Sequence, residues 1–233
     1  MRHHRGVVVL EGFHAVKHAL RFGAEVRSVL VLDRDAALGF ARTHAPDLVG
    51  EFERRAEVVG AGEFVERVGR SHPTGVAGFA ERPAGGGEAR RAPLVLLDNP
   101  RNLGNFGAVI RVAAGLGAGG VVSLGDVDPW HPNVLRGSAG LHFALPVRRL
   151  AGLDEVTGRV VAFDAGGVGL RGLEIPDDAV LAFGSERHGL SDAVRARADL
   201  VVSLPMRPKV SSYNLTTSVA MALYHWELFR QAS

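Results

Sequence analysis

The chain has 233 residues, of which 46% are hydrophobic and 22% charged, and its formal net charge is +2. This composition is typical of a globular protein, and the length suffices for one large core or two modest ones. The sequence holds no cysteine, which excludes disulfides, thiolate nucleophiles and cysteine metal sites.

Neither a long apolar run nor a signal-peptide pattern is found, so we expect a cytoplasmic protein without a membrane partner. The basic residues are almost all arginine, with Lys17 and Lys209 as the only lysines. Arginine suits bidentate contacts to phosphate. A GC-rich genome is the simpler explanation of this richness. The charge therefore permits RNA binding without demanding it.

The N-terminal third alternates short strands and helices, which predicts a small α/β domain with its own core. The expected strands cover residues 7–10, 26–32, 57–59 and 76–80, and the expected helices cover 11–20, part of 36–55, and 62–68. His14 and His18 share one helical face, as metal ligands can, but no third ligand is near them. We expect a half-buried helix face there and no metal.

Residues 83–92 are rich in glycine, proline and charge and lack apolar periodicity, which predicts a linker. The expected domains are therefore residues 1–82 and 93–233. We expect the linker to be flexible, so that limited proteolysis cuts there.

In the second domain, apolar runs at 93–97, 120–124, 179–183 and 200–204 predict buried strands. A helix is expected after the Gly- and Asn-rich turn that follows the first of these strands. A last helix is expected over 214–229, with Ser212 as its N-cap, and Ser191 is expected to cap a helix before it. In an open α/β sheet, loops at the carboxyl ends of such strands hold polar ligands.

The stretch after the last strand carries more polar side chains than a helix cap requires. It reads Leu204-Pro205-Met206, a spacer, Ser212-Tyr213-Asn214, and then Ser-Val-Ala. The turn near residue 105 reads Asn-Phe-Gly-Ala-Val-Ile-Arg, and the loop after residue 183 reads Gly-Ser-Glu-Arg-His-Gly-Leu-Ser. Between them lies Arg136-Gly137-Ser138.

These stretches, in this order, resemble the motifs of the SpoU (TrmH-like) branch of the SPOUT methyltransferases, which methylate ribose 2′-hydroxyls of RNA. The first motif has an asparagine followed six residues later by an arginine. Both Asn102 and Asn105 are candidates for this asparagine, and the six-residue spacing to Arg111 favours Asn105. The segments 11–16 and 71–78 are similar to the two ends of the small L30e/L7Ae-like domain that precedes many SpoU domains.

The resemblance implies a C-terminal domain with a deep trefoil knot, which would hold S-adenosylmethionine. The implied cofactor-binding residues are Gly184, Gly189, Leu204, Met206, Tyr213 and Asn214, and the implied catalytic residues are Asn105, Arg111, Glu186, Ser212 and Asn214. The family usually has leucine where this chain has Tyr213.

Methyl transfer from a sulfonium requires no metal, so the protein mainly positions the reactants and manages one proton. Because arginine is a poor base, we expect Arg111 to stabilise the developing alkoxide. The resemblance also implies a homodimer with shared active sites, for which Trp226 and Phe229 could supply contact area or could equally be core residues.

Ribosomal RNA is the expected substrate by analogy with enzymes that carry the extra domain. The alternatives are transfer RNA, methylation of a base nitrogen, and a catalytically silent RNA-binding protein. The presence of Asn105, Arg111, Glu186 and Asn214 together argues against the silent protein.

Overall fold

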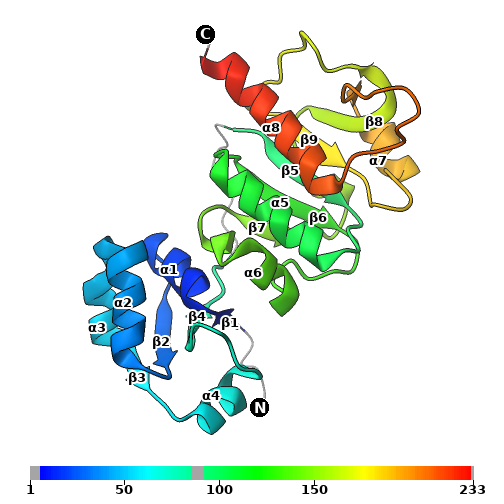
Figure 1. Ribbon diagram of the computed structural model, residues 1–233. Coiled ribbons are helices and arrows are strands. Elements are labelled where there is room, and N and C mark those ends of the chain that lie inside the picture. The colour runs from blue at the N-terminus through cyan, green and yellow to red at the C-terminus, as the bar shows by residue number, and fades with distance from the viewer. Residues whose placement is uncertain (1–5, 85–91, 232–233) are drawn as a thin grey trace. The chain divides into compact units, whose positions relative to one another are not determined.

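The computed structural model describes residues 6–84 and 92–231 and divides the chain into two compact units (Figure 1). Residues 1–84 and 139–144 form the first unit, and residues 85–138 and 145–233 form the second. Of the linker predicted over 83–92, residues 85–91 lie outside the described part of the chain.

The first unit contains a four-stranded sheet in the order β1-β4-β2-β3, in which only β2 and β3 run parallel. Its elements are β1 (Val7–Glu11), α1 (Phe13–Arg21), β2 (Val26–Val31), α2 (Arg34–His44), η1 (Pro46–Leu48), α3 (Val49–Arg55), β3 (Ala56–Val58), α4 (Ala61–Val68), β4 (Val76–Glu81) and η2 (Leu141–Phe143).

Helices cover both faces of this sheet. Phe64 and Val68 of α4 pack on Leu30 in one cluster. On the other face, α1 approaches so closely that a Cβ on Gly78 would lie 3.1 Å from Val16 Cγ2. The helical segment predicted within 36–55 is interrupted at Pro46, since the residue before a proline disfavours helical geometry.

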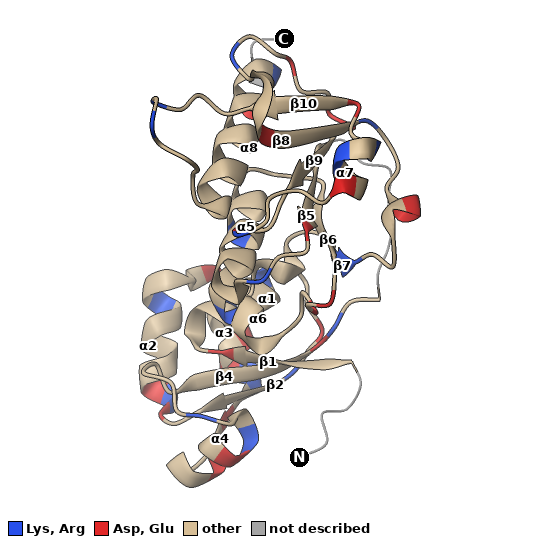
Figure 2. Ribbon diagram, turned by 90° about the vertical axis from the view of Figure 1, so that its right-hand side faces the viewer, with Lys and Arg blue, Asp and Glu red and all other residues tan. Residues whose placement is uncertain are grey.

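The second unit is built on a six-stranded parallel sheet in the order β10-β8-β9-β5-β6-β7. Its elements are β5 (Leu94–Asp98), α5 (Leu103–Gly115), β6 (Gly120–Leu124), α6 (Pro132–Ser138), β7 (Val147–Arg149), η3 (Leu153–Glu155), β8 (Val160–Gly169), β9 (Val180–Phe183), α7 (Asp192–Arg197), β10 (Leu200–Ser203) and α8 (Leu215–Gln231). α5 and α8 pack together over one face of the sheet, and α7 lies on the other (Figure 2). The α/β class with parallel strands is thus confirmed.

Two glycines allow α5 and α6 to cross at backbone contact. A Cβ on Gly107 would lie 2.7 Å from the Cα of Gly137, and a Cβ on Gly137 would lie 3.1 Å from the Cα of Gly107. The crossing fixes α5 at its first two turns, which is the part of the helix that faces the site described below.

The sequence did not predict β7 or β8. The second half of β8 reads Asp-Ala-Gly-Gly, which is typical of a turn, and it is largely exposed. It remains a strand because Gly167 lies against the backbone of Val201 and Val202, where the pairing of β8 with β10 shifts register.

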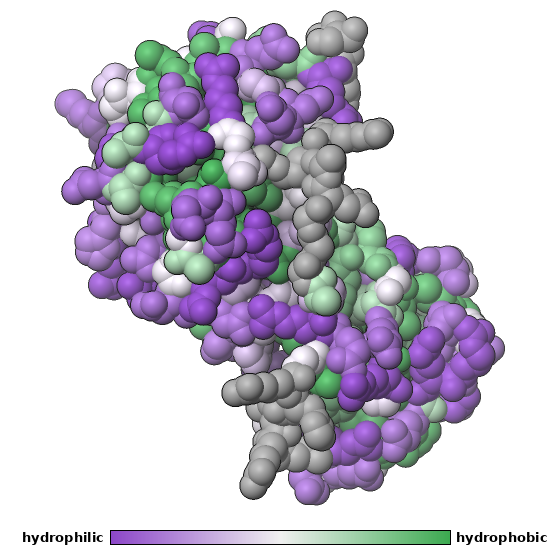
Figure 3. Space-filling view, turned by 180° about the vertical axis from the view of Figure 1, so that it is seen from behind, coloured by the Kyte–Doolittle hydropathy of each residue, from purple (hydrophilic) through white to green (hydrophobic). Residues whose placement is uncertain are grey.

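Hydrophilic residues cover most of the face shown in Figure 3, with hydrophobic residues visible among them on both units. Among the described helices, none has the length and apolar character that crossing a membrane requires.

Candidate functional site

A large pocket opens in the second unit where strands β5, β9 and β10 end, beside the middle of β8. It has a volume of about 1020 Å³, at the upper end of the range of ligand sites. Its position agrees with the rule that open α/β sheets bind ligands at the carboxyl ends of their strands. Every predicted catalytic or cofactor-binding residue except Arg111 lines it: Asn105, Gly184, Glu186, Gly189, Leu204, Met206, Ser212, Tyr213 and Asn214.

The two asparagines that compete for the first motif have different roles in the structure. The side chain of Asn102 caps α5 by accepting a hydrogen bond from the backbone nitrogen of Asn105, at 3.0 Å. The side chain of Asn105 is therefore the one that is available for contacts across the pocket.

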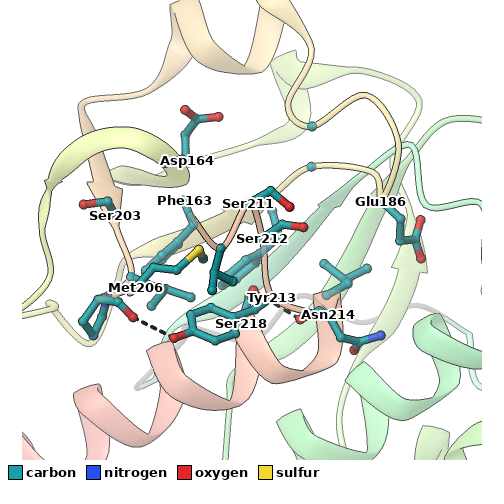
Figure 4. Close-up of a pocket in the computed structure, with 18 of the residues that line it drawn as sticks. Phe163, Asp164, Glu186, Ser203, Met206, Ser211, Ser212, Tyr213, Asn214 and Ser218 are labelled. Atoms are coloured by element: carbon teal, nitrogen blue, oxygen red, sulfur yellow. Dashed lines mark hydrogen bonds between the residues drawn. The ribbon is translucent and has the colours of Figure 1, made fainter. Parts of the chain in front are cut away.

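Asn105 joins the three sequence motifs by hydrogen bonds. Its Nδ2 donates to Oε1 of Glu186 at 2.8 Å, and its Oδ1 accepts from Nδ2 of Asn214 at 3.1 Å. Glu186 and Asn214 lie 81 and 109 residues away in sequence. One amide therefore fixes a carboxylate and a second amide beside each other at one end of the pocket, opposite Ser203 and Met206 (Figure 4).

Glu186 is presented by a tight hairpin at the end of β9. Ser185 and Gly189 exchange two backbone hydrogen bonds, of 2.9 and 3.0 Å. Gly184 has no room for a side chain, because a Cβ there would overlap the backbone of Gly189 and Leu190. Gly189 has a φ of 68°, which favours glycine. The two glycines of the motif thus shape the hairpin itself.

A buried carboxylate anchors the far end of this loop. Asp98, at the end of β5, accepts a hydrogen bond from the backbone nitrogen of Ser191 at 2.5 Å. Ser191 in turn caps α7 by accepting from the nitrogen of Val194, which confirms the predicted N-cap. The hairpin is therefore held at both ends.

The segment between β10 and α8 forms the opposite wall of the pocket. The hydroxyl of Tyr213 donates to the carbonyl of Pro205 at 2.8 Å, which closes this loop across its base (Figure 4). The backbone nitrogen of Val210 donates to the carbonyl of Arg207 within the loop.

The predicted N-cap at Ser212 is wrong. Helix α8 begins at Leu215, and Asn214 caps it, because its Oδ1 accepts from the backbone nitrogen of Thr216 at 2.8 Å. Ser212 instead lines the pocket. A single amide therefore caps α8 with its oxygen and holds Asn105 with its nitrogen.

Residues that the sequence analysis missed form the apolar part of the pocket. Phe163 and Phe183 stack with centroids 4.7 Å apart, and the side chain of Met206 lies beside Phe163 (Figure 4). Phe183 belongs to a predicted strand, but its neighbour Phe163 lies in β8, which was not predicted. That strand was not predicted because the sequence of its second half is typical of a turn.

Asp164 lines the pocket and was also missed. Its Oδ2 accepts from Nη2 of Arg195 on α7 at 2.6 Å, and its Oδ1 accepts from the nitrogen of Gly166. The hydrogen bond from Arg195 holds the pKa of this carboxyl below its usual value. Asp164 therefore stays ionised and ties β8 to α7.

Arg111 does not line the pocket of its own chain. It lies on α5 two turns beyond Asn105, is exposed, and has no hydrogen bond or ion pair to any described residue. The resemblance implies that Arg111 is a catalytic residue together with Asn105 and Glu186, but the structure does not place it in the pocket that they line.

No group of three or more metal-ligating side chains occurs among residues 6–84 and 92–231. His14 is exposed, whereas His18 is half-buried, and its Nδ1 lies 2.7 Å from the carbonyl oxygen of Ala139. Burial lowers the pKa of His18.

Comparison with known proteins places this pocket in a family. The model of the SpoU rRNA Methylase family matches residues 92–224, more than half of the chain and the whole of the site. The chain belongs to this family. It is the family that the motifs in the sequence resemble.

Two relatives match this SpoU methylase along most of its length. A 23S rRNA (adenosine(1067)-2′-O)-methyltransferase of Streptomyces laurentii is 30% identical, over 96% of this chain and 87% of the relative. A 23S rRNA (uridine(2479)-2′-O)-methyltransferase of Streptomyces viridochromogenes is 29% identical, over 94% of this chain and 82% of the relative.

A solved structure agrees with the fold of the whole chain. The SpoU methyltransferase AviRb from Streptomyces viridochromogenes, in complex with the cofactor AdoMet, superposes with a TM-score of 0.79 at 25% identity. The match covers 98% of this chain and 92% of that one.

Proposed function

We propose that this SpoU methylase transfers a methyl group from S-adenosylmethionine to a ribose 2′-hydroxyl of ribosomal RNA. The observation that carries the proposal is the hydrogen-bonded line Glu186–Asn105–Asn214, which joins all three motifs at one end of the pocket. The two relatives described above carry 23S rRNA 2′-O-methyltransferase names, which favours ribosomal over transfer RNA. We also propose that the protein acts in the cytoplasm, where ribosomal RNA is found.

The pocket suits S-adenosylmethionine in size and chemistry. Phe163, Phe183, Leu204 and Met206 offer an apolar slot for the adenine, and the serines of the lining offer hydroxyls for the ribose and amino-acid parts. When bound, the cofactor supplies an electrophilic methyl group on a sulfonium. Gly184, Gly189, Tyr213 and Asn214 would complete the walls around it.

The chain's own contribution is positioning and electrostatics. Asn105 holds Glu186 and Asn214 in fixed places, so that their remaining acceptors and donors, with Ser212, orient the ribose. Arg111 stabilises the developing alkoxide and an RNA phosphate takes the proton, because a guanidinium at neutral pH has no capacity to act as a base.

A homodimer reconciles this role with the position of Arg111. The side chain is exposed outside the pocket of its own chain, so it is free to serve a site shared with a second copy. Trp226 is not available for that contact, because it is 1% exposed and its Nε1 donates to Asp177. Tyr224 and Leu228, exposed one turn apart on α8, and Phe229 remain available.

Two further parts of the proposal concern the chain's organisation. Residues 1–82 are proposed as an L30e/L7Ae-like RNA-binding domain joined through residues 83–92 to a methyltransferase domain at 93–233. The segment after β10 is proposed to pass through a trefoil knot, and the packing of α8 against α5 beside the pocket fits that path.

The test is incorporation of labelled methyl from S-adenosylmethionine into unmodified ribosomal RNA and transfer RNA, followed by alkaline hydrolysis. A 2′-O-methyl group blocks cleavage of the adjacent phosphodiester, so we expect label in alkali-resistant dinucleotides from ribosomal RNA. Label released as mononucleotides would indicate base methylation. Cofactor binding without incorporation into either RNA would favour a silent RNA-binding protein.

A further inference from the structure

The arginines of this protein divide into two groups according to their partners. In the first unit most are neutralised by nearby acids: Arg21 pairs with Asp47, Arg27 with Glu81, Arg54 and Arg55 with Glu51, Arg67 with Glu57 and Glu63, and Arg70 with Glu11. Both α2 and α4 carry acidic as well as basic residues (Figure 2). An arginine already in an ion pair must exchange its partner before it binds phosphate.

Four cations around the pocket differ from these, and from Arg195, because they have no acidic partner among the described residues. The side chains of Arg101, Arg187, Arg207 and Lys209 are exposed and make no hydrogen bond or ion pair with any residue in the described ranges. Arg42, Arg111, Arg159 and Arg171 share this property elsewhere in the chain. Arg101, Arg187, Arg207 and Lys209 are set apart by their position.

All four follow the carboxyl ends of parallel strands. Arg101 follows β5, Arg187 follows β9, and Arg207 and Lys209 follow β10, so the sheet brings them to one edge. Arg207 and Lys209 line the pocket directly. We name these four side chains the basic rim.

Arg101 and Arg187 are sequence neighbours of two residues that hydrogen-bond to Asn105. Arg101 precedes Asn102, whose side chain accepts from Asn105, and Arg187 follows Glu186, to which Asn105 donates. Both arginines therefore follow directly in the chain from the loops that carry the site, and neither lines the pocket itself.

The acids near the rim form no ion pair with it. Asp164 is engaged by Arg195, and Asp98 is buried and bonded to Ser191. Glu186 accepts from Asn105, and Asp192 lies at the start of α7. The four rim cations are therefore not engaged by these carboxylates, although the net charge of the chain is only +2.

We propose that the basic rim binds the phosphates that flank the target nucleotide of the RNA. Unpaired guanidinium groups on loops around a pocket suit bidentate contacts to a backbone that passes over the pocket mouth. This inference rests on the proposed function for the identity of the polymer. It adds which side chains bind the RNA backbone and at which edge of the sheet they lie.

The test compares the double variant Arg101→Gln/Arg187→Gln with the matched control Arg159→Gln. Arg159 is also exposed and without an ion pair, but it precedes β8 at the opposite edge of the same sheet. The probe is a fluorescein-labelled oligouridine, with binding followed by anisotropy over a range of salt concentrations, and calorimetry measures the affinity for S-adenosylmethionine.

We expect the double variant to bind the oligouridine about 25-fold more weakly at 0.1 M salt. Each lost phosphate contact contributes about 0.7 to the slope of log affinity against log salt, so the slope should also fall by about 1.4. The control should change neither quantity by more than about twofold. Cofactor affinity should be unchanged in both variants.

Wild-type RNA affinity in the double variant, or an equal loss of RNA affinity in the control, would contradict phosphate binding by the basic rim. If the double variant also lost cofactor binding, a second variant, Arg101→Lys/Arg187→Lys, would be measured because it keeps both positive charges. Recovery of RNA affinity in that variant would support phosphate binding by the basic rim, and no recovery would contradict it. Rim-dependent RNA binding without methyl transfer would contradict the proposed function alone, and methyl transfer without rim dependence would contradict the rim alone.

Discussion

The two walls of the pocket are held in different ways. The wall formed by α5 and the Ser185–Gly189 hairpin is fixed by backbone hydrogen bonds, by glycines in backbone contact and by the side-chain line through Asn105. The wall formed by residues 205–213 is exposed over most of its length and is closed by one side-chain hydrogen bond, from Tyr213 to Pro205. The first, which we call the fixed wall, is suited to positioning a reacting group. The second, which we call the open wall, is suited to admitting a ligand.

The largest expected effect comes from filling the space in the fixed wall. Gly184→Ala places a methyl group inside the backbone of Gly189 and Leu190, so we expect the loss of about 3 kcal/mol of stability or of soluble protein. Thermal unfolding measures this. Gly115→Ala is the control, because nothing lies within 4 Å of its Cβ position and alanine favours the helix. Equal stability in the two variants would show that the hairpin adapts.

Next in size is the loss of the line that joins the motifs. Asn105→Ala removes the contacts to Glu186 and Asn214, and we expect kcat to fall about 100-fold through misplacement of the reacting groups. Asn102→Ala removes the cap of α5 and one side chain of the pocket lining but neither side-chain contact of Asn105, so it should cost about 1 kcal/mol of stability and leave most of the turnover. Similar losses of kcat in both would contradict the distinction between the two asparagines.

The exposed arginine of α5 gives a smaller expected effect. Arg111→Lys retains the charge but loses the planar guanidinium, so we expect kcat to fall about tenfold. Its melting temperature should match the wild type, since no described residue pairs with Arg111. A near-full rate would mean that the planar guanidinium is not required and that the proposed role of Arg111 is wrong.

The open wall should respond in binding rather than in folding. Tyr213→Phe removes the hydroxyl that closes the loop, and we expect the Kd for S-adenosylmethionine to rise about fivefold, the equivalent of about 1 kcal/mol. Tyr224→Phe changes the chain's other tyrosine, which is 57% exposed on α8, and should leave the Kd unchanged. Calorimetry distinguishes them, and an unchanged Kd in Tyr213→Phe would show that the loop is held by other contacts.

The smallest expected effect concerns pH. The pKa of Asp164 is lowered in the folded protein, chiefly by Arg195, so its contribution to stability is present above the unfolded pKa of about 3.9. It is lost as the pH falls through the folded value. We expect the wild type to exceed Asp164→Asn by less than about 1 kcal/mol at pH 6, because Arg195 is exposed. Denaturant unfolding at falling pH should show this margin disappear below about pH 3.9, and a constant margin would contradict the ion pair as its source.

The fixed wall was largely predictable from sequence. Its residues lie directly after strongly apolar strands, and the glycines and polar residues keep fixed offsets from Asn105 and Glu186. The cap at Asn214 was missed because the local pattern Ser-Ser-Tyr-Asn offers several capping residues, and only the contact with Asn105 selects among them. Phe163 and Asp164 were missed because their strand is stabilised by a neighbour, β10, that lies far away in the sequence.

The line through Asn105 can form only after all three of its residues have been synthesised. Asn105 and Glu186 precede Asn214 in the chain and therefore leave the ribosome first. The sheet from β5 to β9 can therefore assemble while the pocket still lacks one wall. A nascent chain therefore has no complete pocket until the segment that carries Asn214 has emerged.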